Sequence, residues 1–156
     1  MLQVNDNAPL DVVLMDENGD KFTLCDLLGG WVVVYFYPKD DTPGCTIEAE
    51  GFRDMQEAFK KLGARVLGVS KDNCASHQKF IDKKKLTYTL VADEDHSLME
   101  AFGTWGERSF MGRTYMGTSR STFLIDPKGK VVHVWEKVKP IDHAKDVLEV
   151  INRVTS

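Results

Sequence analysis

One cysteine stands in a sequence setting that favours reactivity. Cys45 follows the segment Pro38–Gly44, which comes directly after an apolar run and opens a stretch with helical spacing. A cysteine in the first turn of a helix faces unpaired backbone N–H groups and the positive end of the helix dipole, and both favour its thiolate. The pattern therefore predicts a nucleophilic thiol, although Cys45 could instead be simply a small residue at a helix start.

Ionisation alone does not make such a thiol an efficient catalyst. An ordinary thiol with a pKa of about 8.5 is only about 3% ionised at pH 7. Lowering a thiol pKa to about 6 multiplies the thiolate about thirtyfold, but each thiolate then becomes a weaker nucleophile. Further groups must therefore orient the substrate and stabilise the charge that develops during reaction.

The elements that would position Cys45 alternate between strand and helix. Trp31–Tyr37 and Ala64–Ser70 are continuous apolar runs, which are typical of strands buried on both faces. The Asn-Gly pair in the segment Glu17–Asp20 predicts a hairpin turn between Leu10–Met15 and Lys21–Leu24. The remaining expected elements are a helix that carries Phe52, Met55, Phe59 and Leu62 and stops at Gly63, a helix over Cys74–Lys85, a strand over Tyr88–Ala92, a helix over His96–Phe102, a long loop over Gly103–Thr118, a hairpin of Thr122–Ile125 and Val131–Trp135, and a last helix over Ile141–Val154.

This order predicts one α/β domain over residues 1–156. Strands followed by helices imply right-handed parallel crossovers, and the closing hairpin adds antiparallel strands. The expected architecture is a thioredoxin-like fold, in which a mixed central sheet is flanked by helices and preceded by an N-terminal β-hairpin extension.

Composition limits the classes of partner. The net charge of −4 disfavours nucleic acid and anionic membranes, which require a basic surface. The longest apolar or aromatic run, Trp31–Tyr37, is far shorter than the roughly 20 residues that span a bilayer. No secretory signal is visible, and three cysteines are too few for a disulfide scaffold. We therefore expect a reducing, cytoplasmic location.

Two segments carry a family resemblance. Pro38–Thr46 (PKDDTPGCT) and Tyr115–Gly117 followed by Arg120–Asp126 (RSTFLID) resemble the peroxiredoxins, in particular the bacterioferritin comigratory protein (PrxQ) subfamily. The resemblance spans nearly the whole chain. It implies that Cys45 is the peroxidatic cysteine, which attacks a peroxide and becomes a sulfenic acid, and that Pro38, Thr42 and Arg120 are the other active-site residues.

The chemistry of these residue types is consistent with the implied roles. The Thr42 hydroxyl, three residues before Cys45, can bond a peroxide oxygen, and Arg120 offers fixed donors and a permanent charge. Pro38 can shield the thiolate from water, and Glu48 can accept from Arg120 and fix its orientation. Each also has a plainer interpretation. Thr42 could be only a turn residue and Arg120 only a surface charge. Pro38 could simply terminate the strand, and Glu48 could simply complement the helix dipole.

The residue that resolves the sulfenic acid is left open. Many relatives carry a resolving cysteine five residues after the peroxidatic one, where this chain has Glu50, and others carry it in the region Gln78–Asp82, which holds no cysteine. Cys74 is a possible resolving residue or a bystander, and Cys25 is expected to be buried packing. If neither resolves, the enzyme is of the one-cysteine type and is reduced by an outside thiol.

The resemblance implies a thioredoxin-dependent peroxidase for hydrogen peroxide and organic hydroperoxides. No metal, haem or flavin is expected. Cys74 and His77 have metal-ligand spacing, but a structural zinc site needs a second pair and none is evident, which indicates a surface accident. Thioredoxin or a similar thiol is the expected reductant, and the chain is expected to be a monomer, with a dimer as the alternative. Met111, Tyr115 and Met116 either line an entrance for bulky hydroperoxides or pack the loop.

Two other functions remain as alternatives. A non-catalytic thioredoxin-like binding or holdase module would keep the fold without turnover. A thiol-disulfide oxidoreductase would need a Cys-x2-Cys pair, but Thr42 stands where the first cysteine of that pair would be.

Overall fold

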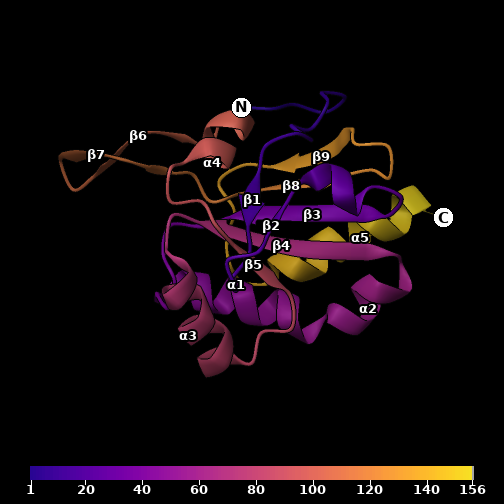
Figure 1. Ribbon diagram of the computed structural model, residues 1–156, viewed down its shortest axis with the longest axis horizontal. Helices are drawn as coiled ribbons and strands as arrows, with labels where there is room; N and C mark the ends of the chain where they lie inside the picture. Colours follow the sequence, from indigo (N-terminus) through magenta and orange to yellow (C-terminus); the bar gives the residue numbers. More distant parts are fainter. Residues whose placement is uncertain (156) are drawn as a thin grey trace.

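The computed structural model describes residues 1–155, so Ser156, the last residue of the predicted domain, lies outside the described residues. Its centre is a five-stranded sheet with the strand order β5-β4-β3-β8-β9 (Figure 1). The strands are β3 (Trp31–Phe36), β4 (Ala64–Ser70), β5 (Thr89–Ala92), β8 (Ser121–Ile125) and β9 (Val131–Trp135). β3 pairs in parallel with β4, and β4 with β5, whereas β8 and β9 are antiparallel. The mixed central sheet is thus confirmed.

Helices cover both faces of this sheet. They are α1 (Pro43–Asp54), α2 (Gln56–Lys61), α3 (Cys74–Lys84), α4 (Ser97–Phe102) and α5 (His143–Thr155). One hydrophobic cluster joins Val33, Tyr35 and Tyr37 to buried residues of α1, α2, α3 and α5. The alternate residues of the same segment, Val32, Val34 and Phe36, belong to a second cluster with α4 and the N-terminal segment. Side chains alternate along a strand, so the apolar run of β3 supplies both halves of the core.

The helix predicted after Cys45 is divided in two. α1 ends at Asp54 and α2 begins at Gln56, with Met55 between them at φ −105° and ψ 10°. Phe52 and Phe59 still point into the same cluster. No helix of the described residues is long and apolar enough to cross a membrane.

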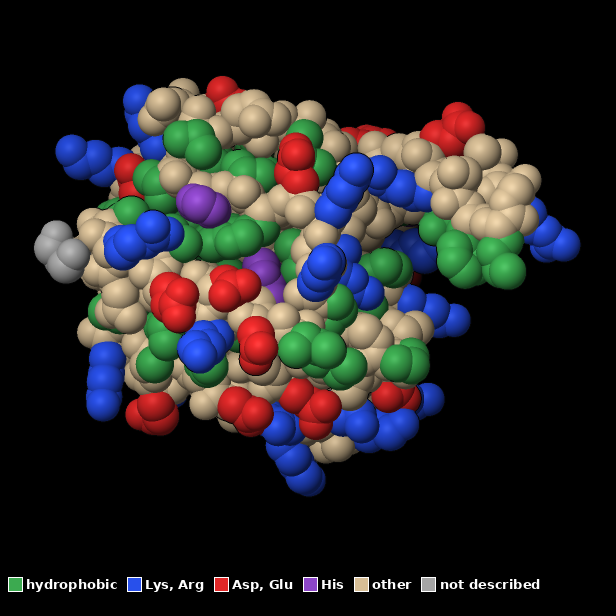
Figure 2. All heavy atoms as spheres, turned by 180° about the vertical axis from the view of Figure 1, so that it is seen from behind, with side chains coloured by type: hydrophobic (Ala, Val, Ile, Leu, Met, Phe, Trp, Pro, Cys, Tyr) green, Lys and Arg blue, Asp and Glu red, His purple; other side chains and the backbone are tan. Residues whose placement is uncertain are grey.

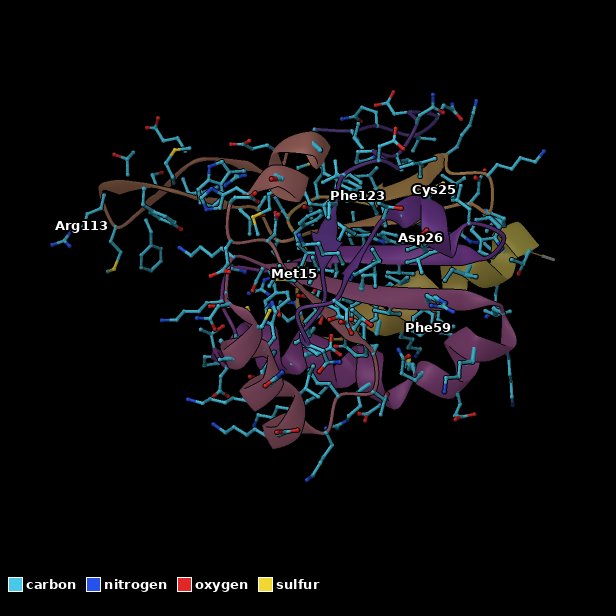
Figure 3. All side chains as sticks on the ribbon, in the orientation of Figure 1. Met15, Cys25, Asp26, Phe59, Arg113 and Phe123 are labelled. Carbon is cyan, nitrogen blue, oxygen red and sulfur yellow. The ribbon has the colours of Figure 1, made fainter. Side chains whose placement is uncertain are left out.

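The N-terminal hairpin is present but short. β1 (Leu14–Met15) pairs antiparallel with β2 (Lys21–Phe22), and the 3₁₀ turn η1 (Leu24–Leu27) follows. Leu24 is fully buried in this turn, whereas Cys25 is exposed (Figure 3). The prediction that Cys25 is buried packing is therefore wrong, because in a single tight turn neighbouring side chains point in different directions and Leu24 takes the inward one.

The segment expected as a long loop is a second hairpin. β6 (Trp105–Phe110) pairs with β7 (Arg113–Thr118) around Met111 and Gly112, whose φ values of 51° and 80° suit a two-residue turn. The hairpin projects from the body (Figures 1 and 2), and polar residues on both of its faces remove the alternation that marks a strand. Its exposed large hydrophobic side chains are Phe110, Met111, Tyr115 and Met116.

Candidate active site

Cys45 lies in the first turn of α1, directly beyond the end of β3. Thr42 is the N-cap and Pro43 is the first helical residue. Proline lacks an N–H group, but at this position the N–H would have no partner within the helix, so the helix loses no hydrogen bond. The first intrahelical bond runs from the Thr46 N–H to the Thr42 carbonyl oxygen at 2.8 Å. The Cys45 side chain is 1% exposed. The thiol is therefore held at a helix N-terminus, almost closed off from solvent.

Arg120 reaches this thiol from the start of the strand next to β3. It directly precedes β8, whose first residue, Ser121, pairs with Phe36 at the end of β3. Arg120 Nη2 donates to Cys45 Sγ at 3.2 Å, and Nη1 donates to Glu48 Oε1 at 2.9 Å. One guanidinium thus spans the thiol and the carboxyl group, as the fixed fork of arginine allows.

A glycine makes this approach possible. A Cβ atom on Gly44 would lie 3.3 Å from Arg120 Nη2 and 3.4 Å from Pro140 Cγ. These distances are at the tight limit of ordinary packing. A side chain at position 44 would therefore push against the donor that reaches the sulfur.

Glu48 stands one helical turn after Cys45 and is completely buried. Its Oε1 accepts from Arg120, whereas Oε2 has no hydrogen-bond partner among the described residues. Burial raises the pKa of Glu48 to about 7, against the opposing charge and hydrogen bond of Arg120. At pH values below about 7 the Glu48 carboxyl group is largely neutral, and the sulfur of Cys45 is then the remaining partner that can carry a negative charge beside Arg120.

Arg120 keeps its own charge in this setting. Burial acts to lower the pKa of its guanidinium, but the neighbouring Cys45 and Glu48 raise it overall. The side chain is 18% exposed, so water screens the interaction only partly.

The loop between β3 and α1 presents Thr42 beside the helix start. Thr42 is half-buried, and its hydroxyl donates to the Lys39 carbonyl oxygen at 2.9 Å, which leaves the hydroxyl oxygen free to accept a hydrogen bond. Asp41, just before it, has a φ of 60°, a left-handed conformation that costs a non-glycine residue about 1 kcal/mol. Pro38 is exposed at the start of this loop.

Sequence reasoning missed a histidine behind the site. His143, the first residue of α5, is buried and its Nε2 lies 2.8 Å from Thr122 Oγ1. Burial, together with the charge of Arg120, lowers the pKa of His143 to about 4, so its ring is neutral at pH 7. No local motif surrounds His143, and only the packing of α5 on the sheet brings it here.

A second histidine was misjudged. His77, expected as part of a surface accident, is fully buried and contacts Asp40 of the active-site loop at 2.7 Å. The period of α3 could have revealed this, because Phe80 lies three residues on and also faces the core.

The other two cysteines do not contact Cys45. Cys74 begins α3, is partly buried, and donates its thiol hydrogen to the Asp16 carbonyl oxygen at 3.3 Å, in the turn of the N-terminal hairpin. Cys25 lies on η1 at the surface (Figure 3). All three cysteines are free thiols.

These contacts define the chemistry that the site can perform. A nearly enclosed sulfur at a helix N-terminus has a fixed cation on one side and a threonine hydroxyl oxygen nearby in the preceding loop. Such an arrangement stabilises negative charge on sulfur and on an oxygen leaving beside it. In the structure Arg120 contacts both Cys45 and Glu48, and Thr42 and Pro38 lie on the adjoining loop.

Comparison with known proteins connects this geometry to a family. Residues 4–134 match the AhpC/TSA family. Peroxiredoxin Bcp of Escherichia coli is 47% identical over 147 residues, 94% of each chain, and peroxiredoxin Bcp of Bacillus subtilis is 43% identical over 150 residues, 96% of this chain and 95% of that one.

Solved structures agree with the sequence relatives. Peroxiredoxin Q of Xanthomonas campestris superposes with a TM-score of 0.92 at 40% identity and covers 100% of this chain and 98% of its own. A cysteine-to-serine variant of PrxQ from Xylella fastidiosa gives a TM-score of 0.95 at 36% identity, covering 100% and 99%. The thioredoxin-like fold is therefore confirmed, and this chain belongs to the AhpC/TSA family, as a peroxiredoxin of the Bcp (peroxiredoxin Q) type.

Proposed function

We propose that this chain is a thiol-dependent peroxidase that reduces hydrogen peroxide and organic hydroperoxides at Cys45. The observation that carries the proposal is the Arg120 guanidinium, which donates to Cys45 Sγ at 3.2 Å and to Glu48 Oε1 at 2.9 Å. The relatives named peroxiredoxin Bcp support it. So does a structural study of the Xanthomonas campestris bacterioferritin comigratory protein, which concerns alkyl peroxide reduction.

The chemical step is a displacement at oxygen. The Cys45 thiolate attacks the terminal oxygen of the hydroperoxide, a sulfur–oxygen bond forms, and the oxygen–oxygen bond breaks. Sulfur is oxidised to a sulfenic acid, and the leaving oxygen departs as alkoxide or hydroxide, which takes a proton from water to give alcohol or water. Arg120 stabilises the charge as it moves from sulfur to the leaving oxygen.

Two residues of the preceding loop complete the proposed site. The Thr42 hydroxyl donates to Lys39, so its oxygen accepts the hydroperoxide O–H and orients the attacked oxygen toward sulfur. Pro38 offers no N–H group to the site and keeps that side of the loop apolar. Glu48 holds the Arg120 fork in place.

Recycling of the sulfenic acid requires a second thiol. An outside thiol attacks the oxidised sulfur, water leaves, and a mixed disulfide forms that a further thiol reduces. Thioredoxin or a similar small dithiol protein fits this role. We favour direct reduction by this partner over resolution by Cys74, because the Cys74 thiol is directed to the Asp16 carbonyl oxygen and its helix would have to open first.

We further propose that the chain works as one domain in the cytoplasm, without a cofactor, and as a monomer. The absence of a Cys-x2-Cys pair disfavours disulfide exchange as its main activity. A holdase that does not turn over peroxide remains the alternative for the test below.

Intact mass under non-reducing conditions tests both parts of the proposal. Reduced protein is mixed with one equivalent of hydrogen peroxide and measured within seconds. A gain of one oxygen on Cys45 supports reduction by an outside thiol, whereas loss of two hydrogens with a Cys45–Cys74 peptide supports an internal disulfide. No change in mass removes the peroxidase assignment.

Three cysteine variants identify which thiol takes part in the reaction. Cys45→Ser should abolish peroxide consumption while the protein stays folded, and retained turnover would contradict the proposal. Cys25→Ser serves as the matched control, since its exposed side chain has no contact with the site. Cys74→Ser separates the two recycling routes: unchanged turnover with thioredoxin excludes Cys74 as the resolving residue.

A further inference from the structure

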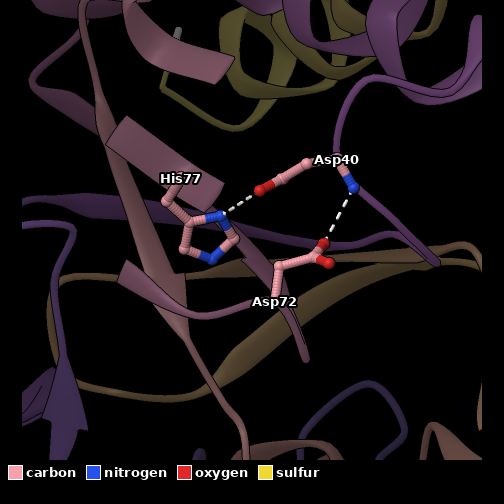
Figure 4. Close-up of side chains that lie close together, drawn as sticks. All are labelled: Asp40, Asp72 and His77. Atoms are coloured by element: carbon pink, nitrogen blue, oxygen red, sulfur yellow. Dashed lines mark hydrogen bonds and ion pairs between the residues drawn. The ribbon is translucent and has the colours of Figure 1, made fainter. Parts of the chain in front are cut away.

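A buried carboxylate anchors the active-site loop to helix α3. Asp40 is 7% exposed, yet its two oxygens accept three hydrogen bonds. Tyr37 Oη donates to Oδ1 at 2.6 Å, and Ser76 Oγ and His77 Nδ1 lie 2.8 Å and 2.7 Å from Oδ2 (Figure 4 shows the histidine contact). The Asp40 N–H also donates to Asp72 Oδ2 at 2.8 Å. Both the side chain and the backbone of this residue are therefore fixed.

The hydrogen bonds of His77 define its charge. Its Nε2 lies 2.9 Å from the Val91 carbonyl oxygen, which can only accept, so Nε2 carries a hydrogen. Its Nδ1 faces Asp40 Oδ2, and the ionised carboxylate also can only accept. Both ring nitrogens are thus protonated, and His77 and Asp40 form a buried ion pair.

This pairing also decides against a metal ion. Asp40, Asp72 and His77 bring ligand-type atoms within 4.8 Å of one another. However, both ring nitrogens of His77 are already engaged as donors, so no lone pair is left for a cation. The cluster is a hydrogen-bonded pair rather than a ligand set.

The surroundings of His77 set the pH range of the pair. Burial acts to lower the pKa of His77, but the hydrogen bond and charge of Asp40, the carbonyl of Val91 and the charge of Asp72 raise it above its usual value. Tyr37, the residue directly after β3, also lies against the ring, and burial raises its pKa well above the usual value, so it stays neutral. The imidazolium is therefore favoured, and it is lost as the pH rises through the raised pKa.

Loss of the proton would turn an attraction into a repulsion. Because Val91 holds the hydrogen on Nε2, the neutral ring presents the lone pair of Nδ1 to Asp40 Oδ2. Two acceptors then face each other without a hydrogen between them, and one must move away. Asp40 belongs to the active-site loop, so the loop moves with it.

The loop needs such an anchor. Asp41 holds a left-handed φ of 60°, and Thr42 directly after it is both the N-cap of α1 and the residue that carries the hydroxyl. A strained turn persists only where its surroundings restrain it. Asp40 is the neighbour that supplies buried restraints, whereas the Asp41–Lys83 ion pair is exposed and contributes little.

We propose that the hydrogen bond from His77 Nδ1 to Asp40 is the positioning device of the peroxide site: it fixes the loop that carries Thr42 and leads to Cys45, and its loss when His77 gives up its proton slows oxidation of Cys45. The inference rests on the proposed roles of Cys45 and Thr42. His77 and Asp40 are positioning residues, since they act on the reaction only through the loop.

Substitution of His77 with two residues of different chemistry tests this inference. His77→Asn keeps an amide donor near the place of Nδ1 but cannot titrate, whereas His77→Leu removes the donor. Lys83→Met is the matched control, because it removes the exposed ion pair to the same loop. The second-order rate constant for oxidation by hydrogen peroxide is measured across pH and divided by the thiolate fraction from ultraviolet absorbance.

The expected pattern separates positioning from stability. His77→Leu should lower the rate constant per thiolate by about tenfold to a hundredfold, the range for a reacting group displaced by about 1 Å. His77→Asn and Lys83→Met should stay within about threefold of the unchanged protein, by the same reasoning. The unchanged protein should lose rate per thiolate as the pH rises through the pKa of His77, and His77→Asn should not.

Three outcomes would overturn the inference. The first is a folded His77→Leu variant that reacts at the unchanged rate, and the second is a rate per thiolate that is flat with pH in the unchanged protein. The third is a loss of rate in His77→Asn equal to that in His77→Leu. If His77→Leu does not fold, the pH dependence of the rate per thiolate in the unchanged protein, compared with that in His77→Asn, still decides. Failure of this inference can be distinguished from failure of the proposed function, because Cys45→Ser would still consume peroxide only if the proposed function were wrong.

Discussion

Arg120 Nη2 lies 3.2 Å from Cys45 Sγ, although 75 residues separate the two in the sequence. The contact exists because β8 pairs with β3 in the register that sets Ser121 opposite Phe36. That register carries the residue before β8 to the edge of the sheet where α1 begins. A shift of the register by one residue would turn Arg120 to the other face.

The first prediction concerns this contact. Arg120→Met should lower the second-order rate constant for Cys45 oxidation by about a hundredfold or more, the usual cost of removing one donor that stabilises developing charge. Arg120→Lys should recover only part of the loss, because an ammonium group cannot span sulfur and carboxyl group as the guanidinium does. Rapid-mixing kinetics with hydrogen peroxide measures both variants, and equal rates for Lys and Met would count against the role of the fork.

The second prediction concerns the pH dependence of stability that Glu48 causes. Its pKa is about 7 in the folded protein against an ordinary value of 4.5, so the folded protein binds this proton more tightly than the unfolded chain. By linkage, the contribution of Glu48 to the free energy of unfolding is fully present below pH 4.5 and declines as the pH rises to about 7. The difference between the two pKa values corresponds to about 3 kcal/mol.

Glu48→Gln removes this titration and keeps the shape of the side chain. The free energy of unfolding of the variant, relative to the unchanged protein, should therefore increase by up to about 3 kcal/mol as the pH rises from 4.5 to 7. Urea unfolding at a series of pH values measures the difference. A difference that does not change with pH would show that Glu48 stays ionised in the folded protein.

The third prediction concerns a glycine beneath the core tyrosines. A Cβ atom on Gly68 of β4 would lie 2.8 Å from Tyr35 Oη and 2.7 Å from Leu90 Cδ2. Tyr35 cannot yield freely, because its hydroxyl lies 2.8 Å from that of Tyr88, which donates to the Ala49 carbonyl oxygen of α1. Gly68→Ala should thus destabilise the fold by about 1–3 kcal/mol, as overpacking does.

Gly106→Ala is the control for this substitution. Gly106 also lies in a strand, but no other atom of residues 1–155 stands within 4 Å of the place where its Cβ would be. The free energy of unfolding of the Gly106→Ala variant should stay within about 0.5 kcal/mol of that of the unchanged protein. If urea unfolding gives the same change in the free energy of unfolding for both variants, the contacts of Gly68 with Tyr35 and Leu90 do not limit the packing.

Much of the scaffold could be predicted because its signals are local. The apolar runs of β3 and β4 and the Asn-Gly turn of the N-terminal hairpin each act within a few residues, and the structure has them where they were expected. The β6–β7 hairpin could not be predicted in this way. Its strands stand away from the body with polar residues on both faces, so no core imposed an alternating pattern on them.

The residues behind the site were hidden for a different reason. His77 and His143 are single histidines without a motif, and whether a histidine is buried depends on what packs over it. Cys25 shows the opposite error, since a free cysteine is usually buried but this one lies on the outside of a single turn. Burial of an isolated residue is decided by contacts distant in sequence.

The sequence by itself determined that Cys45 stands in the first turn of a helix after a buried strand, because strand, turn and helix start follow one another within Trp31–Glu48. Together with the family resemblance, it also named Thr42, Arg120 and Pro38. Only the tertiary structure decided that Arg120 donates to Cys45 and Glu48 together, and that Asp40 and His77 form a buried pair. These contacts depend on strand pairing and helix packing, which join segments that no local pattern connects.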